Sequence, residues 1–332
     1  MSFDLYLYCK KIIRKKKIDK VLKDLGFKFI KEGLYSWFVK KNLTSFKGCR
    51  LSYNKADHDY YVPRGTKIIF TSTTSAARSH EDFEMQIKVI KTLKKEFGGS
   101  AYDPQEGRYA YPINTIPKLS YREKLCGMSF LNFIDNIHTA HSLSSKIPKK
   151  GKMRKSEYLY RYSSNTSILI NNLVIVYLVA IFEAFLKDFF IKYVETSQKA
   201  KEKIYQRTNK LEFKEIKDLL EGSISLTQFL TSKYTFQNLN SANAAYYDYV
   251  DVKLLDIWNR RKKYKNKFFI VREVLEELIQ KRHEIVHEYK LDYMMNKQKL
   301  DFFIIMMDKA ADLFDNYFLN KRKIRLNLEI FV

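Results

Sequence analysis

The hydrophobic pattern of the chain changes part-way along, and this change constrains the fold more than any other feature. Up to about residue 100, short segments rich in β-branched and aromatic residues alternate with two segments of helical spacing. After residue 157 the spacing is helical almost throughout. Only 5 prolines and 10 glycines occur in 332 residues, which favours long helices over a loop-rich fold. The sequence therefore predicts an α+β protein with a mixed first part and an all-helical second part.

The first part is expected to form a small α+β sandwich. Helices are predicted over 16–27 and over 79–99, where Ser79 is a good N-cap and Asp82 takes the third position of a capping box. Gly26 is a stop signal for the first of these helices. Strands are predicted over 3–8, 34–40, 49–54 and 67–74. The order β-α-β-β-β-α suggests a ferredoxin-like arrangement.

Three regions follow from this pattern. Residues 1–120 form a basic α+β domain for recognition or regulation, which ends in a loop over 100–120 that holds three of the five prolines. Residues 121–157 form a helix and a basic linker, and residues 158–325 form the helical domain. Helices in the last region are expected over 164–198, 211–221, 240–264, 268–289 and 297–319, with a terminal strand over 326–332.

Charge is the outlier of the composition. The chain holds 61 basic and 37 acidic residues, a formal net charge of +24. The excess is denser in residues 1–150, with 29 basic and 14 acidic side chains, than in the remainder, with 32 and 23. Such a balance is typical of proteins that contact nucleic acid, an anionic membrane surface or an acidic macromolecule. An AT-rich genome would also enrich lysine, isoleucine, asparagine and tyrosine, so the charge alone does not decide between these interpretations.

The chain is expected to be cytoplasmic. Cys9, Cys49 and Cys126 lie far apart and form no metal-type pair or disulfide ladder, which suits a reducing compartment. The opening MSFDLYLYCK lacks the long apolar core of a signal peptide. The run LVIVYLVAIF at 173–182 is half the ~20 residues that a bilayer requires, so we expect it to be part of a buried helix. No membrane partner is expected.

An arginine interrupts the apolar side of the helix expected over 268–289. Arg282 falls within ~20° of the middle of the stripe, where it is the only charge. An unpaired buried guanidinium would cost several kcal/mol or more, so it requires a carboxylate of the fold or a phosphate of a ligand. Glu183, in an apolar helix, is the internal candidate for a purely architectural ion pair. The stripe consists of Val271, Val274, Leu275, Leu278, Ile279, Ile285, Val286 and Tyr289.

Two histidines lie close to this arginine in the sequence. His287 points ~140° away from Arg282 on an ideal helix, so the two do not meet on one straight helix. They converge if the helix distorts or ends near 287, or if two copies face each other across a two-fold axis. His283 lies one turn before His287 and shares its face.

The segment Arg282–His287, RHEIVH, resembles the R-x4-H signature of the HEPN superfamily (higher eukaryotes and prokaryotes nucleotide-binding). The resemblance covers about 165–320: a leading apolar helix with a glutamate, middle helices, the motif helix and a long last helix. The first 150 residues are outside it. It implies an all-α HEPN-like bundle. Many members are metal-independent ribonucleases that act as dimers, often as toxins or in defence against phage, and others only bind.

The resemblance implies an endoribonuclease that uses the 2′-hydroxyl of RNA as nucleophile and needs no cofactor. His287 would act as base or acid, Arg282 would hold the phosphate, His283 would be a supporting donor and Glu183 would orient Arg282. The products would be a 2′,3′-cyclic phosphate and a 5′-hydroxyl. The alternative is a non-catalytic RNA- or protein-binding dimerisation module on the same fold.

Two basic runs offer contacts to phosphates. RRKKYKNK at 260–267 and KKIIRKKK at 10–17 each hold six positive charges in eight residues. The first leads into the motif helix, so we expect it to bind RNA, with a solvated loop as the alternative. Its cations are Arg260, Arg261, Lys262, Lys263, Lys265 and Lys267. A regulatory partner or ligand is expected at the N-terminal domain.

No metal site is expected. Asp57, His58 and Asp59 lie in a loop without further ligands nearby, which favours a solvated turn. His138 and His141 lie one turn apart on an expected helix but lack a third ligand close by.

Overall fold

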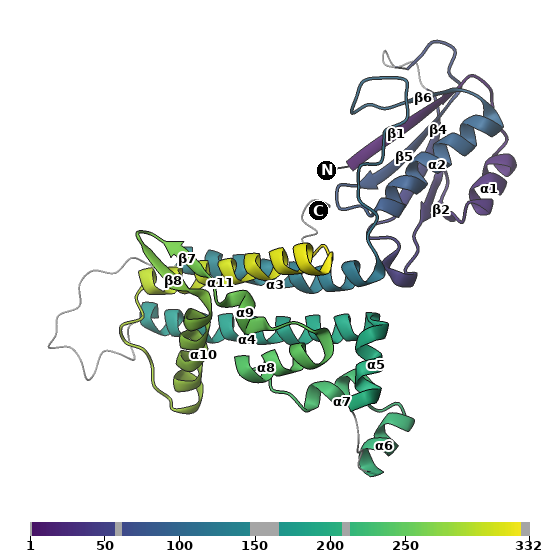
Figure 1. The fold of residues 1–332 in the computed structure, drawn as a ribbon. Coiled ribbons are helices and arrows are strands. Elements are labelled where there is room, and N and C mark those ends of the chain that lie inside the picture. Colours follow the sequence, from purple (N-terminus) through teal and green to yellow (C-terminus); the bar gives the residue numbers. More distant parts are fainter. Residues whose placement is uncertain (1, 57–61, 147–165, 208–212, 327–332) are drawn as a thin grey trace. The chain divides into compact units, whose positions relative to one another are not determined.

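The computed structural model describes residues 2–56, 62–146, 166–207 and 213–326, and the chain divides into two compact units (Figure 1). The first unit runs to Tyr121 and holds an antiparallel sheet. The second begins at Arg122 and is mostly helical. The expected α+β class is confirmed.

The sheet of the first unit has six strands in the order β2-β3-β4-β5-β1-β6, and all neighbouring pairs are antiparallel. All four expected strands are present. Two further strands were not expected from the sequence: β2, whose residues are all exposed, and the three-residue β6. Neither offers a clear alternation of apolar and polar residues. The strands are β1 (Ser2–Cys9), β2 (Lys28–Lys31), β3 (Leu34–Trp37), β4 (Cys49–Lys55), β5 (Ile68–Ser75) and β6 (Ser100–Tyr102).

Two helices accompany this sheet, α1 (Lys15–Asp24) and α2 (His80–Phe97). Helix α2 lies across one face of the sheet and contacts its central strands (Figure 1). The capping box at its start is confirmed: the Ser79 hydroxyl accepts from the backbone of Asp82, and the Asp82 carboxylate accepts from the backbone of Ser79. Asp82 also accepts from the backbone N–H groups of Phe46 and Lys47, at 3.0 and 3.1 Å. An aspartate thus both caps the helix and fixes a neighbouring loop.

The second unit packs its helices around an aromatic core. Phe189 lies at the centre of this core, with its ring 4.9 Å from that of Phe314 and 4.8 Å from that of Phe318. The helices are α3 (Tyr121–Lys146), α4 (Thr166–Thr196), α5 (Gln198–Arg207), α6 (Phe213–Leu220), α7 (Leu226–Ser232), α8 (Leu239–Ala245), α9 (Leu254–Trp258), α10 (Val271–His287) and α11 (Lys297–Tyr317). Short helical turns are η1 (Lys41–Leu43) in the first unit, and η4 (Tyr246–Val250) and η5 (Phe318–Arg322) in the second. Helix α3, expected beside a linker, belongs to this core.

Helix α4 is the longest element, with 31 residues, and contacts α10, α7, α5 and α11. It is the one helix in the described part of the chain that is long and apolar enough to cross a membrane. Its apolar side chains instead build the core of the second unit, and buried Asn171 and Asn172 bond the chain near Met295 and Asp292. The expectation that 173–182 is part of a buried helix is confirmed.

The single helix expected over 240–264 is wrong. The chain forms α8, a π-helical turn η4, the short α9 and then a strand. The break falls at Asp251, whose φ of 60° is left-handed. Arg322 donates to the carbonyls of Val250 and Asp251, and Lys203 pairs with the Asp251 carboxylate. Contacts from distant parts of the chain therefore stabilise the break against local helix propensity.

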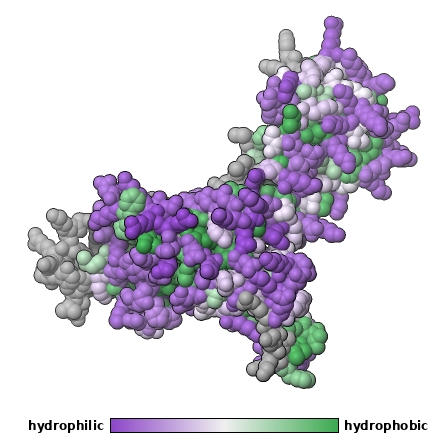
Figure 2. All heavy atoms as spheres, viewed as in Figure 1, coloured by the Kyte–Doolittle hydropathy of each residue, from purple (hydrophilic) through white to green (hydrophobic). Residues whose placement is uncertain are grey.

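Helix α6 carries no buried residue, and Figure 2 shows a hydrophobic area over it. Phe213 and Leu220 are 92% and 83% exposed. The expected strand at 326–332 lies outside the described residues from 327 onward, as does most of the expected linker.

Candidate functional site: the Arg282–His287 pair

Helix α10 has two halves with different surroundings. Val271, Val274, Leu275 and Leu278 in the first half are buried. The expected burial of Arg282 in the second half is wrong, because it is only half-buried. Figure 1 shows that α10 crosses α4 and α11 and then extends beyond them. The apolar stripe therefore continues past the edge of the core that it packs against.

Arg282 and His287 meet within one chain. The Arg282 guanidinium donates from Nη1 to Nε2 of His287 over 3.2 Å, in an exposed position. The helix ends at His287, and Tyr289 then turns the chain with a left-handed φ of 55°. Because the helix ends there, the two side chains converge without a second copy. The His283 ring lies 4.9 Å from the His287 ring, centroid to centroid.

The direction of this hydrogen bond fixes the state of the imidazole. A guanidinium has only donors, so Nε2 of His287 must be an unprotonated acceptor when the contact forms. The lone pair that would remove a proton from a substrate thus points at the arginine. An anion that draws the guanidinium away would release this lone pair.

Glu183 lies on α4, close enough to Arg282 for the two charges to interact. It is half-buried, and its Oε1 is buried without a hydrogen-bond partner among the described residues. Burial raises the pKa of Glu183, and the nearby charge of Arg282 lowers it only in part. Within the described part of the chain no direct ion pair joins Glu183 to Arg282. The expected architectural ion pair is therefore not formed, and Arg282 remains open to another anion.

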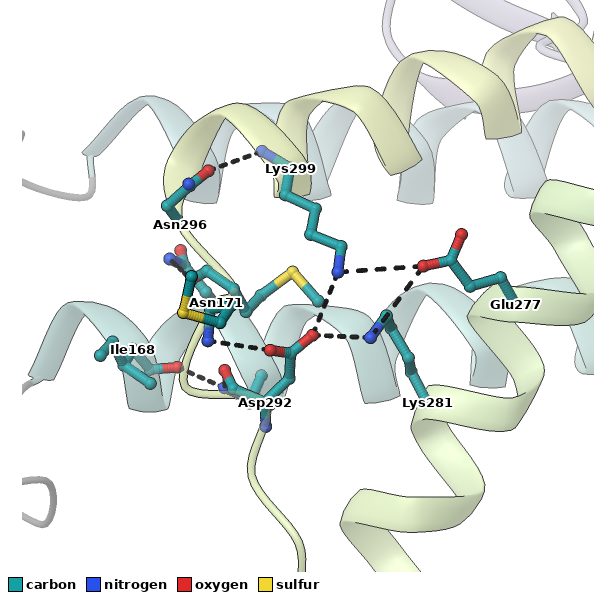
Figure 3. Close-up of polar contacts among 10 residues, drawn as sticks. Ile168, Asn171, Glu277, Lys281, Asp292, Asn296 and Lys299 are labelled. Atoms are coloured by element: carbon teal, nitrogen blue, oxygen red, sulfur yellow. Dashed lines mark hydrogen bonds and ion pairs between the residues drawn. The ribbon is translucent and has the colours of Figure 1, made fainter. Parts of the chain in front are cut away.

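The loop that follows His287 is fixed by Asp292 (Figure 3). The Asp292 carboxylate accepts from Nζ of Lys281 at 2.6 Å and from Nζ of Lys299 at 3.3 Å. The Asn172 side chain accepts from the backbone N–H of Asp292 at 2.9 Å and donates to its carbonyl at 3.1 Å. Helices α4, α10 and α11 thereby hold the loop that leaves the site.

Charge pairing governs the ionisation of this network. Burial alone would raise the pKa of Asp292, but the hydrogen bond from Lys281 and further contacts hold it below its usual value. Burial alone would lower the pKa of Lys281, but Asp292 raises it above its usual value. Both groups are therefore charged across the neutral range.

The basic run at 260–267 is neither helix nor loop. It forms strand β7 (Arg261–Tyr264), which pairs with β8 (Lys267–Ile270) in a hairpin whose turn holds Lys265 at a φ of 51°. The rings of Tyr264 and Phe269 pack against Phe302 of α11, at 5.1 and 4.7 Å between centroids. The inward aromatic side chains therefore explain why a strand pair forms here.

The outward face of this hairpin combines cations with an aromatic ring. Arg261 and Lys263 lie on this face and are exposed. Arg260 before the strand and Lys265 and Lys267 at the turn are also exposed, while Lys262 is half-buried. Phe268 is 67% exposed and lies opposite Lys263 in the strand register. The backbone N–H of Val271, the first residue of α10, donates to the carbonyl of Arg260. A basic and aromatic surface thus leads into the helix that carries the pair.

No group of three or more His, Cys, Asp or Glu side chains that could hold a metal occurs among the described residues. His141 instead contacts Asp308 at 2.8 Å, and His138 is exposed. Asp57, His58 and Asp59 lie outside the described residues. All three cysteines are free and buried.

Sequence reasoning missed Asp292 and Phe268. Asp292 gave no signal, because its contacts depend on how three helices pack together, and Asn172 lies 120 positions away in the sequence. Phe268 gave no clear signal either, because the turn pair Lys265–Asn266 lacks the glycine that two-residue hairpin turns favour.

No family model, curated protein or solved structure matches this chain.

Proposed function

We propose that the chain is a metal-independent endoribonuclease whose site is the Arg282–His287 pair. The observation that carries the proposal is the 3.2 Å contact between the guanidinium and the imidazole at an exposed helix end. An arginine and a neutral histidine in contact provide what RNA cleavage requires: an anchor for a phosphate and a base for a nearby hydroxyl.

The chemistry follows from these two groups. Arg282 moves from His287 to the non-bridging oxygens of a phosphodiester, where its planar fork makes two parallel hydrogen bonds. The freed Nε2 of His287 accepts the proton of the 2′-hydroxyl, the 2′-oxygen bonds to phosphorus, and the bond to the 5′-oxygen breaks. A proton donated to the 5′-oxygen, with His283 as supporting donor, leaves a 2′,3′-cyclic phosphate and a 5′-hydroxyl. General acid–base catalysis of this kind contributes typically ~10²–10⁴-fold.

Glu183 takes a positioning role in this scheme. Its negative charge attracts Arg282 without forming a direct ion pair. Glu183 therefore helps to hold the arginine in position and leaves the guanidinium N–H donors free. A saturated arginine would have no donor left for a phosphate.

The hairpin β7–β8 serves as the RNA-binding surface. Its exposed cations neutralise backbone phosphates, and exposed Phe268 offers a face on which a base stacks. An RNA strand bound to the hairpin would run along α10 toward Arg282, which lies about three helical turns from the start of that helix.

The proposed active form is a dimer of this chain. Exposed apolar side chains lie close to the pair in the sequence: Val286 is 36% exposed, Tyr289 89%, Tyr293 49% and Met294 76%. Their burial between two HEPN-like helical units would bring two such pairs to one two-fold cleft. Activity as a cytoplasmic toxin or in phage defence fits this chemistry. For the first unit we propose a ferredoxin-like core. Leaving aside β2 and β3, which extend one edge of the sheet, the chain order is β1-α1-β4-β5-α2-β6, and β4, β5, β1 and β6 are antiparallel neighbours in that order.

The alternative is a module that binds RNA or protein without cutting it. It is favoured by the same hydrogen bond, because Nε2 of His287 is already occupied by Arg282. An RNA-cleavage assay distinguishes the ribonuclease from the non-catalytic binding module.

The test is incubation of the purified chain with labelled RNA in EDTA. We expect cleavage by the wild type and a loss of ~10²–10⁴-fold in Arg282→Ala and in His287→Ala. Arg272→Ala on the same helix and His138→Ala on α3 are matched controls and should retain activity. Equal cleavage by all five proteins would identify a contaminant and remove the assignment. RNA binding without cleavage would favour the alternative.

A further inference from the structure

The other basic run, at 10–17, lines a cavity in the first unit. The cavity has a volume of about 1020 Å³ and lies between the segment from Tyr8 to Lys17 and the end of α2 with the start of β6. Its charged lining residues are Lys10, Lys11, Arg14, Lys17, Lys95 and Glu96. Five cations and one carboxylate therefore face a single space.

Among the described residues these five cations form no ion pair, and Glu96 is the one acidic residue that lines the cavity with them. All five are exposed. Like charges held around a concave surface repel one another and focus a positive potential into the space between them. Some other cations in the described part of the chain do have partners, as Lys281 has Asp292. An anion in the cavity would therefore stabilise this arrangement.

The start of helix α1 at this cavity gives a second reason. The N-terminus of a helix carries a positive partial charge, so acidic residues are favoured there and lysines are not. The first turn of α1 is Lys15, Lys16 and Lys17, without an acidic residue, and Arg14 at the N-cap makes no side-chain cap hydrogen bond. Both the helix end and the lysines would gain from a bound anion.

The rest of the lining is not charged. Ile12, 82% exposed, contributes an apolar side chain, as do half-buried Ile13 and Phe97. Gly99 has a φ of 108°, and a Cβ there would lie 2.5 Å from the carbonyl oxygen of Tyr8. One wall is therefore bare backbone, with apolar side chains beside it. This combination suits a ligand with an anionic part and an organic body.

The size of the cavity selects the class of ligand. Its volume lies at the upper end of the ~300–1,000 Å³ typical of small-molecule sites. Two short chain segments build all of it, which favours a compact molecule over an extended strand. We infer that this cavity binds a nucleoside polyphosphate, with the phosphates on the cations and the nucleoside against the apolar side chains. This ligand site goes beyond the proposed ribonuclease and does not depend on it.

The test is calorimetric titration of the full chain with ATP, inorganic tripolyphosphate and adenosine, at physiological ionic strength in EDTA. The pocket variant is Lys17→Gln with Lys95→Gln, one from each wall. The matched control is Lys20→Gln with Lys23→Gln, which removes two exposed lysines of α1 that do not line the cavity. Thermal unfolding checks that both fold.

We expect ATP to bind more tightly than tripolyphosphate, and both far more tightly than adenosine. The pocket variant should weaken ATP binding by at least about tenfold and the control by less than about twofold, since each lost contact is charge-assisted. Equal weakening in both variants would overturn the site, because net charge alone would then explain binding. Equal affinity for ATP and tripolyphosphate would overturn the nucleoside part. If the binding of single-stranded RNA, but not the binding of ATP, depends on Lys17 and Lys95, the cavity binds a polymer and the inference is wrong.

Discussion

The two halves of helix α10 have the same helical geometry but opposite surroundings. In the first half, Leu275 and Leu278 are almost completely buried, at 1% and 2% exposure. In the second, His287 is exposed and Arg282 half-buried, and the stripe ends on exposed Tyr289. The first half contributes stability, and the second presents groups that ligands can reach. An amphipathic pattern therefore defines which side of a helix is apolar, but not how far along it the core extends.

The largest expected contrast compares one residue from each half. Leu278→Ala should lower the free energy of unfolding of the helical unit by ~2–5 kcal/mol, because it leaves a cavity in the core. His287→Ala should lower it by less than ~0.5 kcal/mol, as for other exposed positions. Urea unfolding followed by Trp258 fluorescence, in a Trp37→Phe background, measures both. Similar losses for the two variants would break the distinction between the halves.

Arg282→Lys sharpens the contrast within the second half. It keeps the charge but loses the planar fork, so cleavage should slow by ~10²–10³-fold, as when one donor to a reacting oxyanion is lost. Stability should be unchanged. Rates at saturating RNA give the measurement, and a variant as active as the wild type would show that charge alone suffices.

The outward face of the hairpin extends the comparison to RNA binding. Phe268→Ala should weaken RNA binding by ~1–3 kcal/mol, because one stacked base is lost. The cleavage rate at saturating RNA should not change. The control is Leu319→Ala on η5, which removes another exposed apolar side chain, 41% exposed, and should leave RNA binding unchanged. Phe269 is unsuitable as a control because its ring packs on Phe302. Unaltered affinity in Phe268→Ala would exclude the hairpin as a stacking surface.

Asp292→Asn probes the loop that joins the second half to α11. The loss of charge-assisted hydrogen bonds should destabilise the unit by ~1–3 kcal/mol at neutral pH. Because the folded pKa of Asp292 is depressed, its stabilisation is present above its unfolded pKa of ~3.9 and is lost as pH falls through the folded value. The difference between wild type and variant should therefore vanish in acid. Unfolding measured across pH tests this, and a difference that persists in acid would contradict it.

Glu183→Gln should change stability only slightly, and in the direction opposite to Asp292→Asn. Because burial raises the folded pKa of Glu183, the folded state binds more protons and loses stability as pH rises through that value. Glutamine does not titrate, so the variant should equal or exceed the stability of the wild type at neutral pH. RNA cleavage should nevertheless slow, because Arg282 loses its orienting charge. A variant that is both less stable and fully active would remove this role for Glu183.

Local signals in the sequence were sufficient for some elements. The capping box at Ser79, the strands with β-branched residues and the apolar helix α4 all follow from interactions within a few residues, and the structure contains each of them. The Arg282–His287 contact was also within reach, because it requires only that the helix end at His287.

Long-range contacts decided the remaining features. The break at Asp251 depends on Arg322, which lies 71 positions further along, and the hairpin at 261–270 depends on Phe302. The half-exposure of Arg282 depends on how far α10 extends beyond α4 and α11, which it crosses. None of these can be read from the pattern of one segment, since each partner belongs to a different element.

The most direct test of the central claim is the chemistry of the cut ends. RNA treated with the wild-type chain in EDTA should carry 2′,3′-cyclic phosphate and 5′-hydroxyl ends. The same RNA with 2′-O-methyl groups should remain intact, because the nucleophile is blocked. Cleavage of the 2′-O-methyl RNA, or 5′-phosphate ends that appear only when a divalent metal is added, would contradict an Arg282–His287 site that acts through the 2′-hydroxyl.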